Sequence, residues 1–529
     1  MNIKSFFSAA ALLAVPVLPL MAKTRPNILF ILADDATYYH WSANGCPWVN
    51  TPNFDRVAHE GVVFDNCYTP NAKSAPSRAV LLTGRYSWEL GEAGNHISNF
   101  PLDIKVVTDV LKENGYQCAY TGKGWAPGFP GLVNGKIREL TGKAYQEKTL
   151  KPPTTGIFNA DYAGNFELFL KDKEKGKPFF FWFGSREPHR SYQYHSGVEK
   201  GKKNIDMIKH VPAYWPDNET VRNDMLDYGY EIEYLDKQIG KAIKMLKENG
   251  ELENTIIFIT SDNGMPFPRS KANNYNYSNH MPMAIMWPKG IKNPGRRIKD
   301  YVSFVDVTPT FLDIAGVKDY EKVLPLSGHS WRSILEDQMT AKEKDMRKII
   351  LFGRERDDYG RPHNAGYPIR AIMRDGIIYI NNMCSERWPA GHPLTGYLDV
   401  DGSPTKTQVL NLYRGGIDAR YWNFSFAKRP EEEMYDMRND MDCINNLAMS
   451  PDYQGVKEEL KEILFGRLKE MKDPRVVSDN PNVFDHYKFN ESKNENFYER
   501  IKSGELTEPW NQTHWVNPTD YSGYQRNAN

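Results

Sequence analysis

A group of acidic, basic and hydroxyl side chains, spread widely along the chain, has the composition of a site that transfers a charged group. Three carboxylates and one carboxamide form an all-oxygen set, which suits Ca²⁺ or Mg²⁺ better than zinc, because zinc prefers nitrogen and sulfur. Three basic side chains and a histidine beside a divalent cation suit the oxygens of an anionic substrate. The set indicates sulfuryl or phosphoryl transfer and comprises Asp34, Asp35, Ser74, Arg78, Lys123, His189, Asp262, Asn263 and Lys271.

Most of these residues follow short apolar runs that predict buried strands, at residues 27–33, 118–121, 179–183 and 255–260. A continuous apolar run suits a strand that is buried on both faces, as in a parallel sheet. Asp34 and Asp35 close the first run, and Asp262 follows the last. A pair of Asp residues by itself is usually a solvated turn, but ligand sites in open α/β sheets lie beyond the carboxyl ends of the strands. We therefore expect these loops to meet at one edge of a sheet.

Segments with helical character separate the strands, at residues 106–113, 166–171, 221–249 and 306–314, and a fifth strand is expected at 283–287. The repeated order of strand, polar loop and helix predicts an α/β fold with a large doubly wound mixed sheet flanked by helices. Beyond about residue 345, short strands at 349–352 and 377–380 and an amphipathic helix at 453–471 predict a smaller C-terminal α+β region.

These patterns predict a signal peptide at residues 1–22, a catalytic domain at 23–345 and a C-terminal subdomain at 346–529, whose polar tail after Asp473 has no assigned role. The signal peptide is indicated by Lys4 and the apolar run from Phe6 to Leu20, which is too short for a comfortable membrane span. No later stretch is apolar enough for an integral membrane segment. Export to the periplasm is therefore expected, with the cell surface or the medium as alternatives.

The composition of the chain argues against a nucleic-acid partner and against sites built from cysteine. The 67 basic and 67 acidic residues balance, so nothing indicates a nucleic-acid partner. The five cysteines include no CxxC pair, so neither a disulfide framework nor a zinc site is supported.

The stretch from Ser74 to Arg78, Ser-Ala-Pro-Ser-Arg, runs into Leu82-Thr83-Gly84-Arg85. Alone it predicts a loop that enters a helix, because Pro suits a first helical turn and Ser a cap. In company with the other motifs it resembles the signature of the type I sulfatases of the alkaline-phosphatase-like superfamily: Cys or Ser, any residue, Pro, Ser, Arg, and then Thr-Gly-Arg. The resemblance covers residues 24 to 475, through the blocks at 26–35, 51–53, 122–123, 261–264, 306–310 and 433–436.

This resemblance implies that Ser74 is oxidised to formylglycine, and a serine at this position implies a radical maturing enzyme of the serine type. One hydroxyl of the hydrated aldehyde attacks sulfur, and deprotonation of the other then expels sulfate. The resemblance also implies one Ca²⁺ ion, held by Asp34, Asp35, Ser74, Asp262 and Asn263.

The resemblance also assigns roles to the basic residues. Arg78 matches the residue that steadies the formylglycine, Lys123 matches the sulfate-binding lysine, and His189 matches the histidine that contacts the sulfate or the leaving group. Lys271 lies near the position of a further basic contact.

One position departs from the family pattern. Many sulfatases carry a histidine two residues after the lysine that corresponds to Lys123, and here that residue is Trp125. We expect His189 to carry more of the acid role, unless another residue supplies it. Trp125 is expected either to form a wall that faces the sugar or to pack within its own loop.

Short blocks at 261–268, 187–190 and 368–370 resemble the heparan N-sulfatase (sulfamidase) branch, which cleaves the sulfamate of N-sulfoglucosamine. The expected substrate is therefore a sulfated glycan, and the alternative is an exo-acting O-sulfatase on another host or algal glycan. The charged segment 353–364 is expected either to bring Arg361 and His363 to the sugar or to be a solvated loop.

Two other classes remain. A phosphatase or phosphodiesterase of the same superfamily would often use two zinc ions, and the histidines that zinc would need are lacking. A glycan-binding protein with an unmodified Ser74 is the third interpretation, and the sequence leaves it open.

Overall fold

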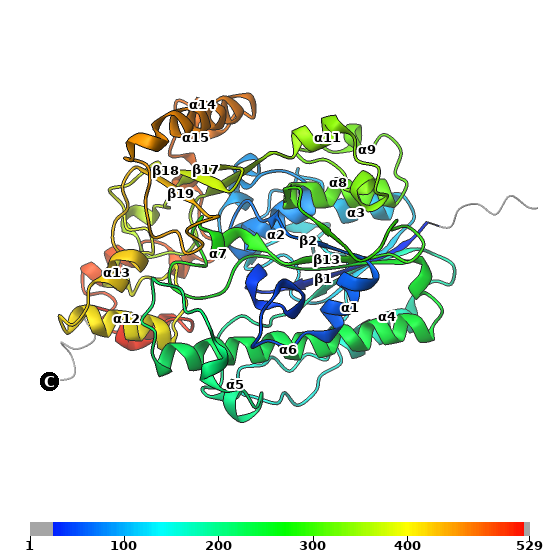
Figure 1. The fold of residues 1–529 in the computed structure, drawn as a ribbon, viewed down its shortest axis with the longest axis horizontal. Coiled ribbons are helices and arrows are strands. Elements are labelled where there is room, and N and C mark those ends of the chain that lie inside the picture. The colour runs from blue at the N-terminus through cyan, green and yellow to red at the C-terminus, as the bar shows by residue number, and fades with distance from the viewer. Residues whose placement is uncertain (1–24, 523–529) are drawn as a thin grey trace, which may run out of the picture.

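A computed structural model describes residues 25–522, which form a large sheet, a smaller sheet and the helices that cover them (Figure 1). The large sheet has the strand order β14-β2-β13-β11-β1-β10-β5-β9. Its strands are β14 (Arg296–Ile298), β2 (Val62–Phe64), β13 (Met283–Met286), β11 (Thr255–Ser261), β1 (Asn27–Ala33), β10 (Phe179–Gly184), β5 (Gln117–Gly122) and β9 (Lys143–Ala144). The four central strands are parallel, whereas β13 is antiparallel to β11. The predicted large mixed sheet is therefore confirmed.

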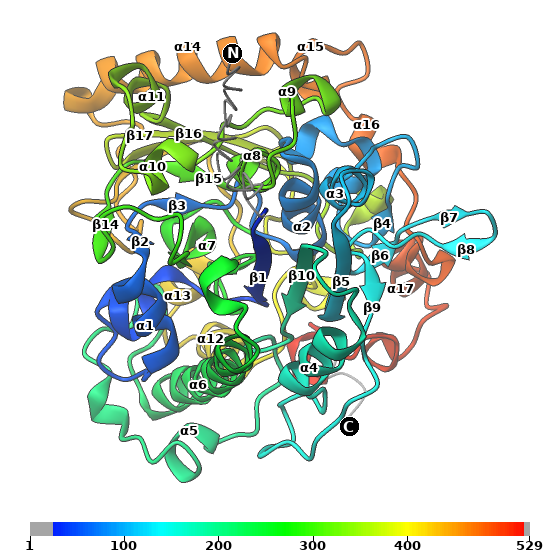
Figure 2. The same ribbon diagram turned by 90° about the vertical axis from the view of Figure 1, so that its right-hand side faces the viewer.

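The apolar run of β1 is buried on both faces because helices cover both sides of the sheet (Figure 2). Ile28, Phe30 and Leu32 share one core cluster with helices α2 (Ser74–Thr83), α3 (Val107–Glu113) and α8 (Val307–Ile314). The alternate residues Leu29 and Ile31 share the other cluster with α1 (Pro52–Glu60), α4 (Tyr162–Asp172) and α6 (Glu219–Glu248). Alternate residues of one strand therefore pack into the apolar layers on its two faces, as in doubly wound folds.

The smaller sheet is antiparallel, with the order β16 (Ile349–Arg354), β17 (Ile369–Arg374), β18 (Ile377–Asn382) and β19 (Glu432–Asp436). Helix α14 (Gln454–Glu470) packs on it through Leu460, Leu464 and Leu468, whose spacing of four places them on one helix face. This is the smaller α+β region that the sequence predicts.

The tail after Asp473 returns from the small sheet to the large one. It includes α15 (Pro474–Val477), α16 (Val483–His486) and α17 (Phe497–Lys502). The side chain of Asn95 donates to the carbonyl of Phe484 at 2.8 Å, and the Asn490 amide donates to the carbonyl of Ile97 at 3.0 Å. The tail is therefore fixed against loops of the catalytic region.

Short elements complete the described part. A three-stranded sheet contains β12 (His280–Met281), β3 (Cys67–Tyr68) and β15 (Val302–Ser303), and two small pairs contain β4 (Ser98–Asn99), β6 (Gly128–Phe129), β7 (Leu132–Val133) and β8 (Lys136–Ile137). The remaining helices are α5 (Ser196–Glu199), α7 (Asn276–Asn279), α9 (Tyr320–Val323), α10 (Arg332–Leu335), α11 (Ala341–Met346), α12 (Pro404–Arg414) and α13 (Arg420–Ser425). Among residues 25–522, none of the helices has the length and apolar character needed to cross a bilayer. The predicted signal peptide lies outside the described residues.

Candidate active site

The predicted polar residues meet at the carboxyl edge of the large sheet. Parallel pairing continues past the strands: the Asp262 amide donates to Ala33 O at 3.1 Å, and the Lys123 amide donates to Gly184 O at 2.7 Å. Gly122 has φ +70°, and a Cβ there would lie 1.9 Å from Gly184 O, so this close approach needs glycine. The loops after β1, β11, β5 and β10 therefore open side by side, as ligand sites of this sheet type require.

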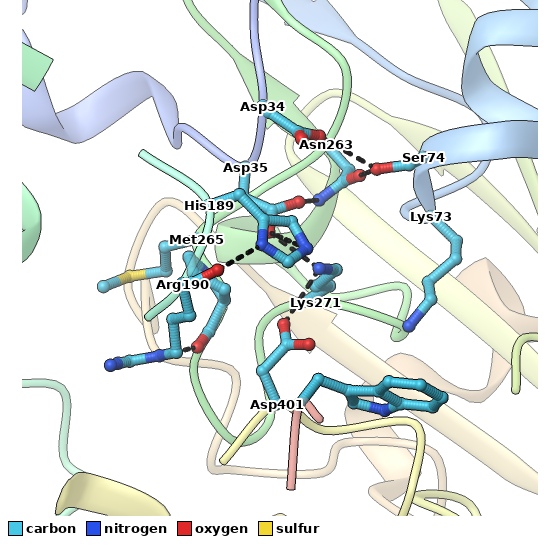
Figure 3. A network of polar contacts seen from close by, with 12 residues as sticks. Asp34, Asp35, Lys73, Ser74, His189, Arg190, Asn263, Met265, Lys271 and Asp401 are labelled. Carbon is cyan, nitrogen blue, oxygen red and sulfur yellow. Dashed lines mark hydrogen bonds and ion pairs between the residues drawn. The ribbon is translucent and has the colours of Figure 1, made fainter. Parts of the chain in front are cut away.

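Ser74 is the first residue of α2 and is buried at this edge (Figure 3). Its Oγ donates to Asp34 Oδ1 at 3.0 Å and lies 3.1 Å from Lys123 Nζ. A helix N-terminus and an ammonium group both favour negative charge at the position of this oxygen. The surroundings thus suit an oxygen nucleophile that carries developing negative charge.

Three buried carboxylates, those of Asp34, Asp35 and Asp262, offer oxygens that lie within 4.8 Å of one another. Burial, together with the neighbouring carboxylates of Asp34 and Asp35, raises the pKa of Asp262 to about 6. Burial would also raise the pKa of Asp34, but the charges of Lys123 and Arg78 hold that pKa well below its usual range. Clustered oxygen donors of this kind fit a hard divalent cation.

The amide of Asn263 belongs to the same cluster. Its Nδ2 donates to Asp35 Oδ1 at 2.6 Å, and its Oδ1 lies 3.4 Å from Ser74 Oγ. With the three carboxylates, it completes the all-oxygen set that could hold a metal ion.

Basic side chains join the loops around these acids. Arg78 donates through Nε to Asp262 Oδ2 at 2.9 Å and through Nη2 to Asp34 Oδ1 at 3.2 Å, and its Nη1 donates to the carbonyls of Lys123 and Gly124. Lys123 Nζ lies 2.7 Å from both Asp34 oxygens. Arg78 is therefore a clamp that holds three loops in register, while Lys123 lines the cavity.

His189 presents one defined nitrogen to the site. Its Nδ1 lies 2.7 Å from the carbonyl oxygen of Arg190, and a carbonyl can only accept, so Nδ1 carries a proton. The other nitrogen, Nε2, lies 3.7 Å from Asp35 Oδ2 and is the atom that can gain or lose a proton. The side chain is 30% exposed. This arrangement suits proton transfer to a leaving group.

A cavity of about 600 Å³ lies over this cluster and includes Asp34, Ser74, Lys123, His189 and Lys271 in its lining. This size falls in the range of small-molecule sites. The structure therefore brings together the predicted nucleophile, acid and cations around one substrate-sized space.

Several cavity residues were not identified from the sequence, namely Lys73, His96, Asp358, Asp401 and tail residues between Asn490 and Trp515. Lys73 Nζ lies 2.5 Å from Asp358 Oδ2, and Lys271 Nζ lies 2.8 Å from Asp401 Oδ2. The charged segment 353–364 does reach the cavity, through Asp358 and Tyr359. No local pattern marks Asp401 or the tail.

Three residues predicted to contact the substrate do not line this cavity. Trp125 is 6% exposed, donates its indole N–H to Ala75 O at 2.9 Å and packs edge-on against Phe100, so it is the packed loop residue rather than a sugar-facing wall. Arg361 is buried against Asp399, and the His363 side chain is 92% exposed. Both line a different cavity of about 470 Å³, which does not include Ser74. Of their segment, the Ser74 cavity includes Asp358 and Tyr359.

The fold and this site define a hydrolase of anionic esters, in which a hydroxyl at a helix N-terminus faces an acidic cluster and a set of cations. Residues 26–317, more than half of the chain, match the sulfatase family. The chain belongs to this family and is a sulfuric ester hydrolase.

Curated relatives carry sulfatase names. An ulvan-active sulfatase of Formosa agariphila is 29% identical over 86% of this chain and 82% of its own. An N-acetylglucosamine-6-O-sulfatase of Bacteroides thetaiotaomicron is 27% identical, covering 85% and 87%. The human N-sulphoglucosamine sulphohydrolase is 25% identical, covering 87% and 93%.

Solved structures share the fold. One, determined in complex with its substrate D-glucosamine-2-N,6-O-disulfate, matches with a TM-score of 0.62 at 22% identity, over 88% of this chain and all of the other. A phosphonate monoester hydrolase of Agrobacterium radiobacter matches with a TM-score of 0.56 at 17% identity, over 85% and 97%. The same fold therefore carries more than one ester chemistry, and the family match identifies this one as sulfatase.

Proposed function

We propose that this protein removes sulfate from a sugar of a sulfated glycan, through a formylglycine derived from Ser74 and with one Ca²⁺ ion. The observation that carries the proposal is the position of Ser74 Oγ at the cavity, 3.0 Å from Asp34 Oδ1 and 3.1 Å from Lys123 Nζ. Oxidation of Ser74 would be performed by a radical maturing enzyme of the serine type. The hydrated aldehyde would offer two hydroxyls, one as the nucleophile and one for release of sulfate.

The chain's own residues suit the binding of the sulfate group. Asp34, Asp35, Asp262 and Asn263, together with the modified residue 74, would hold the ion, whose positive charge would offset the charge of the sulfate oxygens. Lys123 Nζ contacts both Ser74 Oγ and Asp34 Oδ1, so its positive charge can stabilise negative charge on either oxygen. Arg78 keeps this geometry by clamping Asp34 and Asp262.

His189 is assigned the acid role. With Nδ1 held by the Arg190 carbonyl, a proton on Nε2 is directed into the cavity, where the leaving oxygen or nitrogen of the sugar would lie. Transfer of this proton neutralises the leaving group as its bond to sulfur breaks. The carboxylate of Asp35 lies 3.7 Å from His189 Nε2.

We propose N-sulfoglucosamine as the substrate to test first, because a human relative named N-sulphoglucosamine sulphohydrolase matches 87% of this chain. The second candidate is an O-sulfated sugar, since other relatives are named as an N-acetylglucosamine-6-O-sulfatase and an ulvan-active sulfatase. Both would be glycan fragments that enter the same cavity.

The expected location is the periplasm, with modification of Ser74 before export. Cell fractionation of the native host, with an antibody against the chain, tests this location. Recovery of the mature protein in the cytoplasm would contradict it.

The first experiment is sulfate release by protein that is co-expressed with a serine-type maturing enzyme. The panel holds N-sulfoglucosamine, glucosamine and galactose sugars sulfated at single oxygens, and the matching phosphate esters. Loss of two hydrogens from the Ser74 peptide, read by mass spectrometry, reports the modification. A modified protein that releases phosphate but no sulfate would overturn the proposal, and Ser74→Ala is the inactive control.

A further inference from the structure

Asp401 places an unused hydrogen-bond acceptor at the substrate cavity. The residue is 4% exposed and lines the cavity. Its Oδ2 accepts from Lys271 Nζ at 2.8 Å, and its Oδ1 accepts no hydrogen bond from the residues that the structure describes. Figure 3 shows one oxygen of this carboxylate bonded to Lys271 and the other turned away from that lysine. Because Asp401 lines the cavity, a donor from water or from a ligand can reach this oxygen.

The loop that carries Asp401 is built to hold this position. The buried ammonium of Lys406 donates to the carbonyls of Gly396 and Val400 at 2.8 Å each. On the other side of Asp401, the Gly402 amide donates to the Trp515 carbonyl at 2.5 Å. The carboxylate is therefore fixed on both flanks by contacts within the chain, so the free oxygen has a defined direction.

Another acid of the cavity lining, Asp358, differs in one respect. Its Oδ2 lies 2.5 Å from Lys73 Nζ, and its Oδ1 lies 3.2 Å from His96 Nδ1. Both oxygens are occupied, so Asp358 orders Lys73 and His96 in the cavity wall, whereas Asp401 retains one free acceptor.

An aromatic side chain accompanies the free acceptor. Trp515 lines the same cavity, is half-buried and has its indole N–H engaged by Leu398 O at 3.2 Å. An apolar ring beside a polar acceptor matches a sugar, which offers C–H faces and hydroxyl donors. A second sulfate on that ring would instead meet the negative charge of Asp401.

We propose that Asp401 is a specificity-determining residue whose free Oδ1 accepts a hydrogen bond from a hydroxyl or N–H group of the sugar ring that carries the scissile sulfate. This inference rests on the proposed function and deepens it. The sugar it selects has an unmodified donor at one ring position and no second sulfate there.

The test uses the modified full-length enzyme and the monosulfated sugar that the panel identifies, with each remaining hydroxyl replaced in turn by hydrogen. Asp401→Ala should lower kcat/KM on the complete sugar by about 10- to 100-fold, the effect of one charged hydrogen bond. For one deoxy sugar, kcat/KM of the native enzyme should fall by a similar factor relative to the complete sugar. The Asp401→Ala variant should show little further loss of kcat/KM on that deoxy sugar. Asp358→Asn is the matched control, and its loss should be the same on every deoxy sugar.

A second readout separates failure of this inference from failure of the proposed function. Binding of unsulfated glucosamine and N-acetylglucosamine, measured by calorimetry, requires no turnover. Weaker binding by Asp401→Ala, with an unchanged thermal midpoint, supports the inference even if the sulfate panel fails. The inference would be overturned if the free-energy losses from Asp401→Ala and from removal of the hydroxyl were additive for every deoxy sugar and the binding of the unsulfated sugars were unaffected.

Discussion

The acid role of His189 gives the most discriminating prediction, because it depends on one nitrogen atom. Replacing His189 by Ala removes the proton from Nε2 and leaves the Arg190 carbonyl facing the cavity. Removal of a positioned general acid typically costs 10²–10⁴ in rate. We expect the upper part of this range, because two groups that could replace the histidine are poor substitutes.

Two such groups can be compared directly. Trp125, where many sulfatases carry a histidine, has no titratable group and is packed against Ala75. His96 lines the cavity, but burial lowers its pKa to about 4, so it is neutral at the pH where the enzyme would work. We therefore expect a loss of about 10³–10⁴ in kcat, or about 4–5.5 kcal/mol, on a sugar sulfate.

The assay compares that sugar with 4-nitrophenyl sulfate, whose phenolate departs without a proton. His189→Ala should lose less than about tenfold on the aryl ester. His363→Ala is the matched control, because that histidine is 92% exposed and lines a different cavity, so both rates should stay unchanged. An equal loss on both substrates would refute the acid role and assign His189 to sulfate binding.

Three further predictions follow from burial and charge. Burial and neighbouring carboxylates raise the pKa of Asp262 to about 6, so its contribution to the stability of the metal-free protein is present at low pH and is lost as pH rises through 6. Added Ca²⁺ should therefore raise Tm more at about pH 8 than at about pH 5. A Tm shift that does not depend on pH would contradict the metal site. Arg370→Ala should destabilise by about 3–5 kcal/mol, because it leaves the buried Asp473 carboxylate without its ion pair, while Glu355 keeps Arg475. Arg374→Ala on the same strand, with an exposed partner, should cost about 0–1 kcal/mol in urea unfolding. Trp125→Phe should lower Tm, through loss of its bond to Ala75 O, with KM unchanged; a raised KM at unchanged Tm would restore the sugar-wall interpretation.

The strands and helices of the catalytic region are close to those expected from periodicity. The helix expected at 221–249 is α6 (Glu219–Glu248), and it begins where the Asn218 side chain caps the Val221 amide. The strand expected at 283–287 is β13 (Met283–Met286), but its antiparallel direction has no local signal. Direction depends on how the chain returns to the sheet, which is a property of the whole fold.

The sequence by itself determined the central strands of the sheet, the family and the reacting edge. Apolar runs define strands buried on both faces, and residues directly after parallel strands must meet at the carboxyl edge. For this reason Asp34, Asp262 and Lys123 could be placed together from spacing alone, and the motif around Ser74 could be joined to them.

Only the tertiary structure decided which residues line the rest of the cavity. Asp401 and Trp515 come from an irregular loop and from the tail, and neither follows a strand. Whether a charged residue faces a substrate or a buried partner depends on long-range packing: Arg361 is buried against Asp399, while Asp358 of the same segment reaches the cavity. Periodicity indicates which face of an element is apolar, but it does not indicate which distant loop will cover that face.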